Sequence, residues 1–324
     1  MLKLLRKKTG NRTEDKGMKT TFDKVNIHYH KRLGRGAFGE AWNVTFHLKG
    51  SDVSTENTLN RLSFPGKHWA MKVVSLSRLK EDDKNLIRNE KCIWEKLCHP
   101  HMLKLEHFFE SKNTMYFVSE LMEESLRDVH ERMHRLGAKP KSITICNFLI
   151  PVASGMTYMH SLDLIHRDIK SENILLSNQG ETIKLSDFGL SRVVEGKEMT
   201  FETGSYRWMA PEVIRHERYD HKCDVFSFAM LMYETITLSV PFSKFSPVEA
   251  AFEVARFGRR PVLPPTTKDF ETLIEDCWRQ DSKLRPEFGE IQTRLSDILS
   301  KKESFGTLET RFGSLMRTSN LTID

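Results

Sequence analysis

Closely spaced cysteine pairs are missing from this sequence. Its 324 residues include five cysteines, an odd number, which are separated by at least five other residues and form no CxxC pair. Disulfide frameworks and structural zinc sites are built from such pairs, so we expect neither. Reduced thiols are typical of the cytosol and the nucleus, and the sequence therefore predicts a cytoplasmic protein, with the nucleus left open.

Two histidines, His28 and His30, flank Tyr29 near the N-terminus. Zinc sites use three or four ligands, and no second ligand pair accompanies these two in the sequence. We interpret them as surface or strand residues rather than as metal ligands.

Long apolar runs and a strong charge of one sign are also absent. Stretches such as residues 226–232 are interrupted by polar residues, here Ser227, and are typical of buried helices rather than of membrane spans. The formal net charge of +6 arises from 50 basic and 44 acidic residues spread along the chain. Nucleic-acid-binding proteins concentrate basic residues on one face, with aromatics between them. We expect neither nucleic-acid binding nor integral membrane association.

Hydrophobic periodicity divides the chain into a strand-rich first part and a helix-rich second part. Alternating apolar residues predict strands within residues 25–48 and at 69–74, 103–109 and 115–120. Apolar residues at helical spacing predict helices at 82–97, 143–161, 222–237, 247–257, 268–279 and 288–300. This order indicates an α+β fold with two lobes.

Composition predicts the boundaries of these parts. Residues 1–22 are expected to form a basic flexible tail, 23–300 one domain, and 301–324 a basic tail rich in Ser and Thr. A polar loop is expected at 49–67. The small lobe, the connecting segment and the large lobe are expected at about 23–119, 120–124 and 125–300.

A glycine-rich run stands between the first two predicted strands. It consists of Gly34, Arg35, Gly36, Ala37, Phe38 and Gly39. Glycines let the backbone turn tightly and bring N–H groups close to phosphate oxygens. In a dinucleotide-binding fold the last glycine would open a helix, whereas here a strand follows. A hairpin that covers a nucleotide is the better interpretation.

Lys72 lies inside the apolar strand predicted at 69–74. A lysine in such a strand is costly to bury unless it meets an anion, although a surface lysine is the alternative interpretation. Glu90 lies on the amphipathic helix predicted at 82–97, where it would hold Lys72 against the phosphates of a nucleotide.

The densest set of chemical groups lies between Ile165 and Leu176 and includes Asp168, Lys170 and Asn173. Asp168 can accept the proton of an incoming hydroxyl, and Lys170 can neutralise a phosphoryl group during its transfer. Asn173 and Asp187, the latter in an Asp-Phe-Gly triplet, offer the oxygen ligands that Mg²⁺ prefers. The sequence therefore predicts phosphoryl transfer.

In this order and spacing, the motifs resemble those of the eukaryotic-type protein kinase family over roughly Val25–Ser300. The resemblance implies a bilobal kinase fold, with a small β-rich N-lobe that carries one main helix, a hinge, and a larger helical C-lobe. It also implies that Asp224 braces the backbone at His166–Asp168, and that Arg285 pairs with Glu212 of an Ala-Pro-Glu triplet.

The same resemblance implies that ATP and Mg²⁺ bind. Ser119 is similar to the gatekeeper residue, Glu120–Met122 to the hinge that bonds adenine, and Ser125 to the ribose contact. Ala41 stands where the family usually has a valine over the adenine, so looser packing is expected there. The implied ATP-binding residues are Gly34, Arg35, Gly36, Ala37, Phe38, Gly39, Ala41, Ala70, Lys72, Glu90, Ser119, Glu120, Met122, Ser125, Leu175 and Asp187, with Asn173 and Asp187 as metal ligands.

Two segments indicate which hydroxyl, that of Ser/Thr or that of Tyr, accepts the phosphoryl group. Lys170 is typical of Ser/Thr kinases, because tyrosine kinases usually have alanine there. Residues 203–209 are similar to the tyrosine-kinase-like (Raf-like) group, in which a hydroxyl at Ser205 bonds the catalytic Asp168 and Lys170. We expect Ser/Thr specificity, with a dual-specificity kinase and a pseudokinase scaffold as alternatives. A pseudokinase would lack a catalytic group, and all of them are present.

Arg167, which precedes the catalytic aspartate, needs an anion to pair with, and a phosphate on the activation segment usually supplies it. Thr200 and Thr203 are the candidate phosphorylation sites, ahead of Ser191. We therefore expect protein substrates and an upstream or trans-acting kinase as partners; the sequence does not indicate an oligomeric state.

Overall fold

The computed structural model describes residues 25–36, 38–48, 66–77, 79–111, 113–193 and 205–303. Several predictions fall outside these residues. They concern the tail at 1–22, the C-terminal tail beyond residue 303, most of the loop at 49–67, Ala37, and the activation-segment residues Thr200 and Thr203. The other predicted site residues are described.

The chain divides into two compact units. The first consists of Met1–Asn85 and Lys104–Leu121, and the second of Leu86–Leu103 and Met122–Asp324. The chain passes from the first unit to the second after Leu121, inside the segment predicted as a hinge. Residues 86–103 belong to the second unit, whereas the predicted small lobe includes them.

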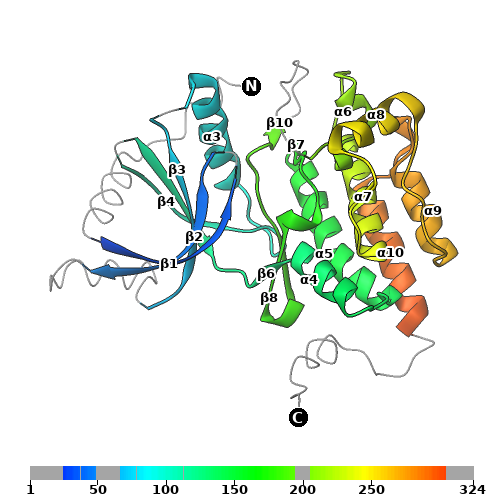
Figure 1. Ribbon diagram of the computed structural model, residues 1–324, viewed down its shortest axis with the longest axis horizontal. Helices are drawn as coiled ribbons and strands as arrows, with labels where there is room; N and C mark the ends of the chain where they lie inside the picture. The colour runs from blue at the N-terminus through cyan, green and yellow to red at the C-terminus, as the bar shows by residue number, and fades with distance from the viewer. Residues whose placement is uncertain are drawn as a thin grey trace, which may run out of the picture. The chain divides into compact units, whose positions relative to one another are not determined.

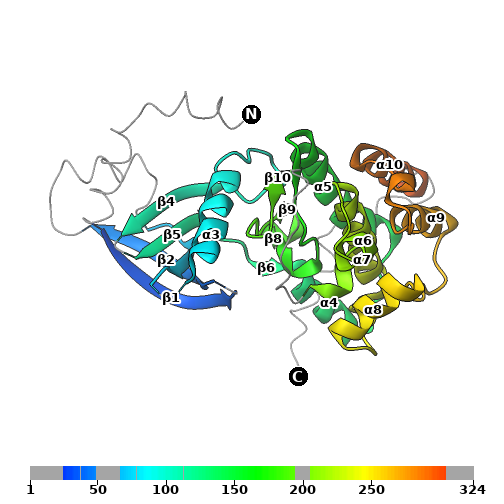
Figure 2. The same ribbon diagram turned by 90° about the horizontal axis from the view of Figure 1, so that it is seen from above.

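The first unit is built on one sheet, visible from two sides in Figures 1 and 2. Its strands are β1 Val25–Arg35, β2 Glu40–Leu48, β3 Trp69–Ser75, β4 Leu105–Ser111 and β5 Thr114–Glu120. They lie in the order β1-β2-β3-β5-β4, and neighbouring strands are antiparallel.

The two faces of this sheet differ because side chains alternate along a strand. One face carries a buried apolar cluster of Val44, Phe46, Trp69, Met71, Phe109 and Val118. The opposite face carries Ala41, Ala70 and Lys72, since Ala41 pairs directly with Lys72 across the β2–β3 ladder.

Helices dominate the second unit (Figure 1). Most of α3 Glu81–Trp94 belongs to it, and it contains α4 Leu126–Arg135, α5 Ser142–Ser161, α6 Pro211–Ile214, α7 Lys222–Thr237, α8 Pro247–Phe257, α9 Lys268–Cys277 and α10 Phe288–Glu303. Helix α7 is buried along most of its length, and α5 packs against α10, α7 and β9. These helices form the core on which the loops of the site are supported.

Short strands and 3₁₀ turns carry those loops. A three-stranded sheet has the order β6-β8-β9, and a two-stranded sheet joins β7 with β10. Their bounds are β6 Glu124–Ser125, β7 Leu164–Ile165, β8 Ile174–Ser177, β9 Thr182–Leu185 and β10 Arg192–Val193. The 3₁₀ turns are η2 Ser171–Asn173, η3 Asn178–Gly180, η4 Tyr206–Trp208 and η5 Ser282–Leu284.

Helix α5 is more apolar than the sequence analysis indicated. Among the described residues, it is long and apolar enough to cross a membrane by length and composition, with a mean hydropathy of 1.3. Core helices of folded domains pass the same test, and Leu149, Val152 and Met156 of α5 are fully buried inside the unit.

The α+β class is confirmed, and the predicted strands and long helices are found within a few residues of their expected ends. The sequence analysis missed α4, α6 and the short strands β6 to β10.

Candidate active site

Lys170 lies at the centre of the polar groups in the catalytic loop. Its ammonium Nζ donates to both carboxylate oxygens of Asp168, at 2.7 and 3.0 Å, and to the hydroxyl of Ser205 at 2.8 Å. Asp168 and Ser205 are both buried. The lysine therefore links the predicted base to a residue 35 positions further along the chain.

Asn173 completes this group from the end of η2. Its amide Nδ2 donates to the main-chain carbonyl and to the Oδ2 of Asp168, both at 2.8 Å. Because both amide hydrogens are used, the amide oxygen of Asn173 is the atom left to contact a cation.

Asp187 is placed beside Asn173 by the β8–β9 hairpin. Asn173 directly precedes β8, Asp187 follows β9 after Ser186, and Ile174 pairs with Leu185. Ser186 donates its main-chain N–H and its hydroxyl to the carbonyl of Asn173, both at 2.9 Å. The exposed Asp187 has a left-handed backbone, with φ of 64°. The two predicted metal ligands thus lie at the same end of one hairpin.

Asp224, on α7, braces the backbone before Asp168 as the resemblance implied. Its carboxylate, fully buried, accepts from the N–H of His166 at 2.9 Å and that of Arg167 at 2.8 Å. His160 Nε2 lies 2.9 Å from the same carboxylate. Burial would raise the pKa of Asp224, but the bond and the charge of His160 outweigh it and lower that pKa. These bonds hold Arg167 in a left-handed conformation, with φ of 70°.

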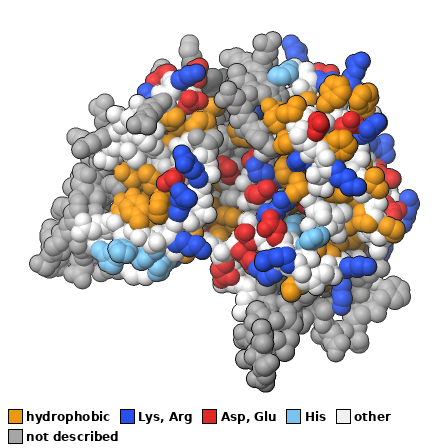
Figure 3. All heavy atoms as spheres, in the orientation of Figure 1, with side chains coloured by type: hydrophobic (Ala, Val, Ile, Leu, Met, Phe, Trp, Pro, Cys, Tyr) orange, Lys and Arg blue, Asp and Glu red, His pale blue; other side chains and the backbone are white. Residues whose placement is uncertain are grey.

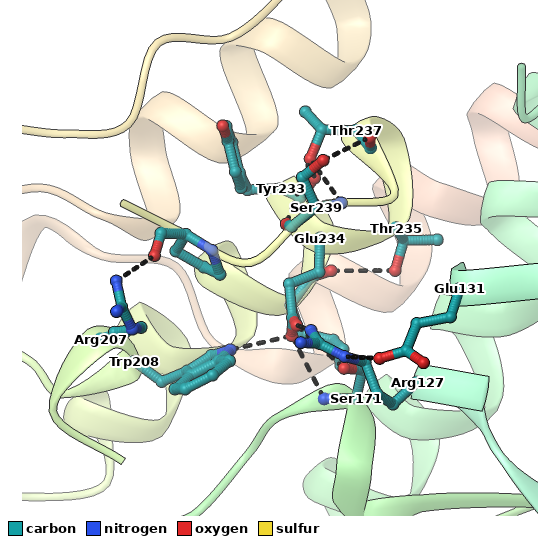
Figure 4. A network of polar contacts seen from close by, with 12 residues as sticks. Arg127, Glu131, Ser171, Arg207, Trp208, Tyr233, Glu234, Thr235, Thr237 and Ser239 are labelled. Carbon is teal, nitrogen blue, oxygen red and sulfur yellow. Dashed lines mark hydrogen bonds and ion pairs between the residues drawn. The ribbon is translucent and has the colours of Figure 1, made fainter. Parts of the chain in front are cut away.

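Glu234, also on α7, is the hub of a second buried network, drawn in Figure 4. It accepts from the indole Nε1 of Trp208 at 2.8 Å and from Arg127 at 3.1 Å. Ser171 donates its hydroxyl at 2.9 Å and its main-chain N–H at 3.2 Å. Burial raises the pKa of Glu234 to about 7, although the bonds from Trp208 and Ser171 oppose the rise. One carboxylate therefore connects η2, η4, α4 and α7.

Arg167 is the expected partner of an activation-segment phosphate. Its guanidinium donates to the carbonyl of Leu190 at 3.1 Å. Ser191, the least favoured candidate for modification, is buried, and its main chain accepts from Asn89 at 3.2 Å. The phosphate itself stays a prediction, because Thr200 and Thr203 lie outside the described residues.

The predicted pair of Glu212 and Arg285 is confirmed. The Arg285 guanidinium donates to both oxygens of Glu212, at 2.5 and 2.8 Å, and both residues are buried. The pair ties α6, which follows the activation segment, to the turn after η5.

In the first unit, the glycine-rich run is the hairpin between β1 and β2. Gly36 N–H donates to the carbonyl of Gly39 at 2.8 Å. A Cβ atom on Gly39 would lie 2.2 Å from the carbonyl oxygen of Val73, so only glycine fits there. Gly34, Arg35, Gly36, Phe38 and Gly39 are described, and Ala37 is not.

The same unit places Lys72, Ala41 and Ala70 on one face of the sheet, as described above. Ala70 pairs with Ser119 across the β3–β5 ladder, and Ser119 is buried with 3% of its surface exposed. Glu120 ends β5. Ser119, the predicted gatekeeper, thus lies beside Ala70, a predicted adenine contact on the neighbouring strand.

The remaining predicted contacts lie in the second unit. Glu90 on α3 is 1% exposed, and a Cβ atom on Gly189 would lie 3.4 Å from its Oε2, which places it beside the Asp-Phe-Gly triplet. Met122 is buried and Leu175 lies half-buried on β8. The pairing of Glu90 with Lys72 stays a prediction.

Ser125 has a role that the sequence analysis missed. It is the N-cap of α4: its hydroxyl accepts from the N–H of Asp128 at 3.2 Å and donates to the Asp128 carboxylate at 2.6 Å. A ribose contact would compete with this capping box, and it stays a prediction.

The predicted Mg²⁺ site offers two ligand side chains from the protein, those of Asp187 and Asn173. In the described ranges, no three His, Cys, Asp or Glu side chains are arranged to hold a metal ion. One carboxylate and one amide oxygen, from Asp187 and Asn173, suit Mg²⁺, which is usually bound by one or two carboxylates together with phosphates and water.

Comparison with known proteins decides the family. The profile of the family described as "Protein tyrosine and serine/threonine kinase" matches residues 27–295. The chain belongs to the protein kinase family. Members of this kinase family generally use ATP and Mg²⁺.

Relatives with assigned activities include several plant kinases from Arabidopsis thaliana. Serine/threonine-protein kinase STY17 is 35% identical over 279 residues, which are 86% of this chain and 45% of the relative. Serine/threonine-protein kinase STY46 is 32% identical over 86% of this chain and 51% of its own length. Serine/threonine/tyrosine-protein kinase HT1 is 31% identical over 79% of this chain and 66% of its own. The chain thus spans about half to two thirds of the length of these three relatives.

Within the kinase fold, the sequence analysis missed Glu234 and its donor Arg127. A signal was present: Glu234 is an acidic residue in the otherwise apolar run of α7, where an unpaired carboxylate would be costly. Its donors come from 26 to 107 residues away, and nothing in the sequence identifies them.

Proposed function

We propose that this chain is a protein serine/threonine kinase of the tyrosine-kinase-like (Raf-like) group. It transfers the γ-phosphoryl group of ATP to Ser or Thr hydroxyls of proteins. The observation that carries the proposal is the set of bonds from Lys170 to Asp168 and to Ser205. This set puts a base, a cation and a hydroxyl of the activation segment in one arrangement, and phosphoryl transfer depends on such positioning.

Each group has a role in the proposed reaction. Asp168 accepts the proton of the incoming hydroxyl and aligns its oxygen with the phosphorus atom. Lys170 stabilises negative charge on the phosphoryl group in transfer. The amide oxygen of Asn173 and the carboxylate of Asp187 hold Mg²⁺, which when bound neutralises charge on the ATP phosphates.

The residues of the first unit bind the nucleotide. Main-chain N–H groups of the hairpin at 34–39 contact phosphate oxygens, and Lys72 pairs with the α- and β-phosphates. Ala41, Ala70 and the hinge residue Glu120 contact the adenine.

The acceptor class rests on Lys170 and Ser205 together. A lysine that holds the activation segment next to the base favours a Ser or Thr hydroxyl, which reaches less far from the backbone than that of tyrosine. The name of the relative HT1 includes tyrosine as an acceptor, so dual specificity is the second candidate.

Regulation and location are part of the proposal. An upstream or trans-acting kinase phosphorylates Thr200 or Thr203, and Arg167 binds the phosphate. The protein acts in signalling in the cytosol or nucleus without integral membrane association. All five cysteines lie in the described ranges and are free, which fits a reducing compartment.

The proposal is tested by incubating the purified chain with radiolabelled ATP, Mg²⁺ and a general protein substrate, followed by phosphoamino-acid analysis. We expect labelled phosphoserine or phosphothreonine. Lys72→Met, prepared in parallel, is expected to incorporate none. Phosphotyrosine beside them would establish dual specificity.

A pseudokinase scaffold predicts a different result. If neither the wild type nor a sample pre-phosphorylated by an upstream kinase transfers label, while ATP still stabilises the fold, the chain binds nucleotide without turnover. That result would overturn the kinase proposal and leave the fold assignment intact.

A further inference from the structure

Four histidines gather on the sheet of the first unit, although they come from three separate stretches of the chain. His28 and His30 lie on β1, His47 lies on β2, and His68 directly precedes β3. We call these four residues the histidine cluster. Figure 3 shows histidine side chains grouped together on the surface of this unit. The second ligand pair that is missing near His28 and His30 in sequence is therefore supplied by the fold.

The strand register places these side chains on one face. His28 pairs with Thr45 and Asn26 with His47, and cross-strand partners share a face of the sheet. His68 joins them because its Nδ1 lies 2.7 Å from Asn43 Oδ1. This face is opposite to the buried apolar cluster, and all four histidines are exposed.

Distances between the rings are close to those of shared metal ligands. The ring centroid of His30 lies 4.6 Å from that of His28 and 4.6 Å from that of His68. The centroid of His28 lies 6.3 Å from that of His47. With Zn–N bonds of about 2.0–2.1 Å, two imidazoles on one ion have centroids roughly 5 Å apart. The rings of His28 and His68 each lie at about this spacing from the ring of His30.

Two of the ring nitrogens already converge on a single atom. His30 Nε2 and His47 Nε2 lie 2.9 and 3.0 Å from the Thr45 hydroxyl oxygen. Metal ions bind the neutral imidazole.

We propose that the histidine cluster is a binding site for one divalent transition-metal ion that prefers imidazole nitrogen, represented by Zn²⁺. In the described part of the chain no three such side chains are arranged to hold a metal ion as they stand, so the proposed site forms only when the exposed rings rotate onto the ion. The bound ion joins β1, β2 and the start of β3. Neither the site nor its test depends on kinase activity.

The test uses the full chain without a histidine tag. Cys92 and Cys98, the two exposed thiols, are first replaced by serine so that they do not compete for the ion. Titration with ZnCl₂ by calorimetry is expected to show one saturable site per chain. The variant His28→Thr/His30→Thr loses two ligands and is expected to bind at least tenfold more weakly, since even an outer partner of a ligand contributes about ten- to a hundredfold.

A matched control replaces two exposed histidines of the second unit, His134→Asn/His216→Asn, and is expected to bind Zn²⁺ like the parent. Thermal unfolding gives a second measurement. Zn²⁺ should raise the midpoint of the parent and EDTA should reverse the rise, whereas the midpoint of the His28/His30 variant should not respond. The proposal is overturned if the parent has no saturable site, or if both histidine variants bind equally well. Should the His28/His30 variant fail to fold, His68→Asn replaces it.

Discussion

At the scale of single residues, Lys170 has the most consequential contacts of the site. The Lys170 ammonium group donates to both Asp168 and Ser205, and it therefore fixes the position of the catalytic side chain relative to the activation segment. The Ser205 hydroxyl is an acceptor from a charged group, and such bonds contribute about 1.5–3 kcal/mol. Loss of this bond should therefore lower turnover rather than the affinity for ATP.

We expect Ser205→Ala to lower kcat by about ten- to a hundredfold, because the bond energy above converts to that range of rates. The KM for ATP should change little, since Ser205 contacts Lys170 and not the proposed nucleotide residues. Steady-state kinetics measures both constants. Ser205→Thr keeps a hydroxyl and should retain most of the rate; equal rates for Ser205→Ala and the wild type would show that the bond is not used in catalysis.

The buried side chain of His130 makes the free energy of unfolding depend on pH in the acidic range. It is 2% exposed on α4, and neither ring nitrogen has a hydrogen-bond partner in the described structure. Burial, with a smaller contribution from the charge of Arg127, lowers the pKa of His130 from 6.5 to about 3. The folded state therefore keeps the ring neutral, and the unfolded state binds a proton first. This contribution to stability is complete above pH 6.5 and is lost as the pH falls toward 3.

We expect His130→Phe to reduce the acid sensitivity of the fold. The free energy of unfolding, measured by urea denaturation between pH 4 and 7.5, should fall less steeply for the variant than for the wild type. His134→Phe, an exposed position at the end of the same helix, is the control and should follow the wild type. Parallel curves for wild type and His130→Phe would contradict the assignment of a buried neutral ring.

At the scale of elements, Glu234 connects the catalytic loop to the segment that follows Ser205. It receives donors from η2, η4 and α4 while lying on the buried helix α7. Its pKa is raised from 4.5 to about 7, mainly by burial. A carboxyl group whose folded pKa is raised adds stability that is complete below pH 4.5 and is lost as the pH rises through about 7.

We expect Glu234→Gln to remove this contribution. As the pH rises from 4.5 to 7, the free energy of unfolding of the wild type should therefore fall relative to that of the variant. Chemical denaturation at several pH values measures it, and Glu290→Gln, an exposed change on α10, serves as the control. A difference that stays constant across this range would show that Glu234 does not titrate there.

Much of the element pattern was predictable from the sequence, because strands and long helices bury one periodic face. Helix α4 was missed although its signals are present. Ser125 and Asp128 form a capping box, and the buried Leu126, Val129 and Met133 recur at helical spacing.

Groups of the site that are close in sequence were predictable, whereas the remote ones were not. Asp168, Lys170 and Asn173 lie within six residues, and together with the Asp-Phe-Gly triplet at Asp187 they indicated phosphoryl transfer. The network of Glu234 depends on tertiary packing, because its carboxylate meets donors as far away as Arg127. The histidine cluster likewise depends on strand register, which residue order near His28 does not reveal.

At the scale of the whole molecule, the family assignment and the proposed activity rest on different observations. Membership of the kinase family follows from the match over residues 27–295. Activity depends on whether this chain's own groups transfer a phosphoryl group, and the chain spans only 45% of its relative STY17. The central claim is that Asp168 acts as the base of a working kinase.

The most direct test compares the kcat of the wild type with that of Asp168→Asn, alongside the affinity of both for ATP with Mg²⁺. Asparagine keeps the shape of the side chain but cannot accept the proton, and a positioned base contributes about 10²- to 10⁴-fold. We predict a fall in kcat of that size with ATP affinity retained. Full turnover by Asp168→Asn, or no turnover by a phosphorylated wild type that still binds ATP, would contradict the account.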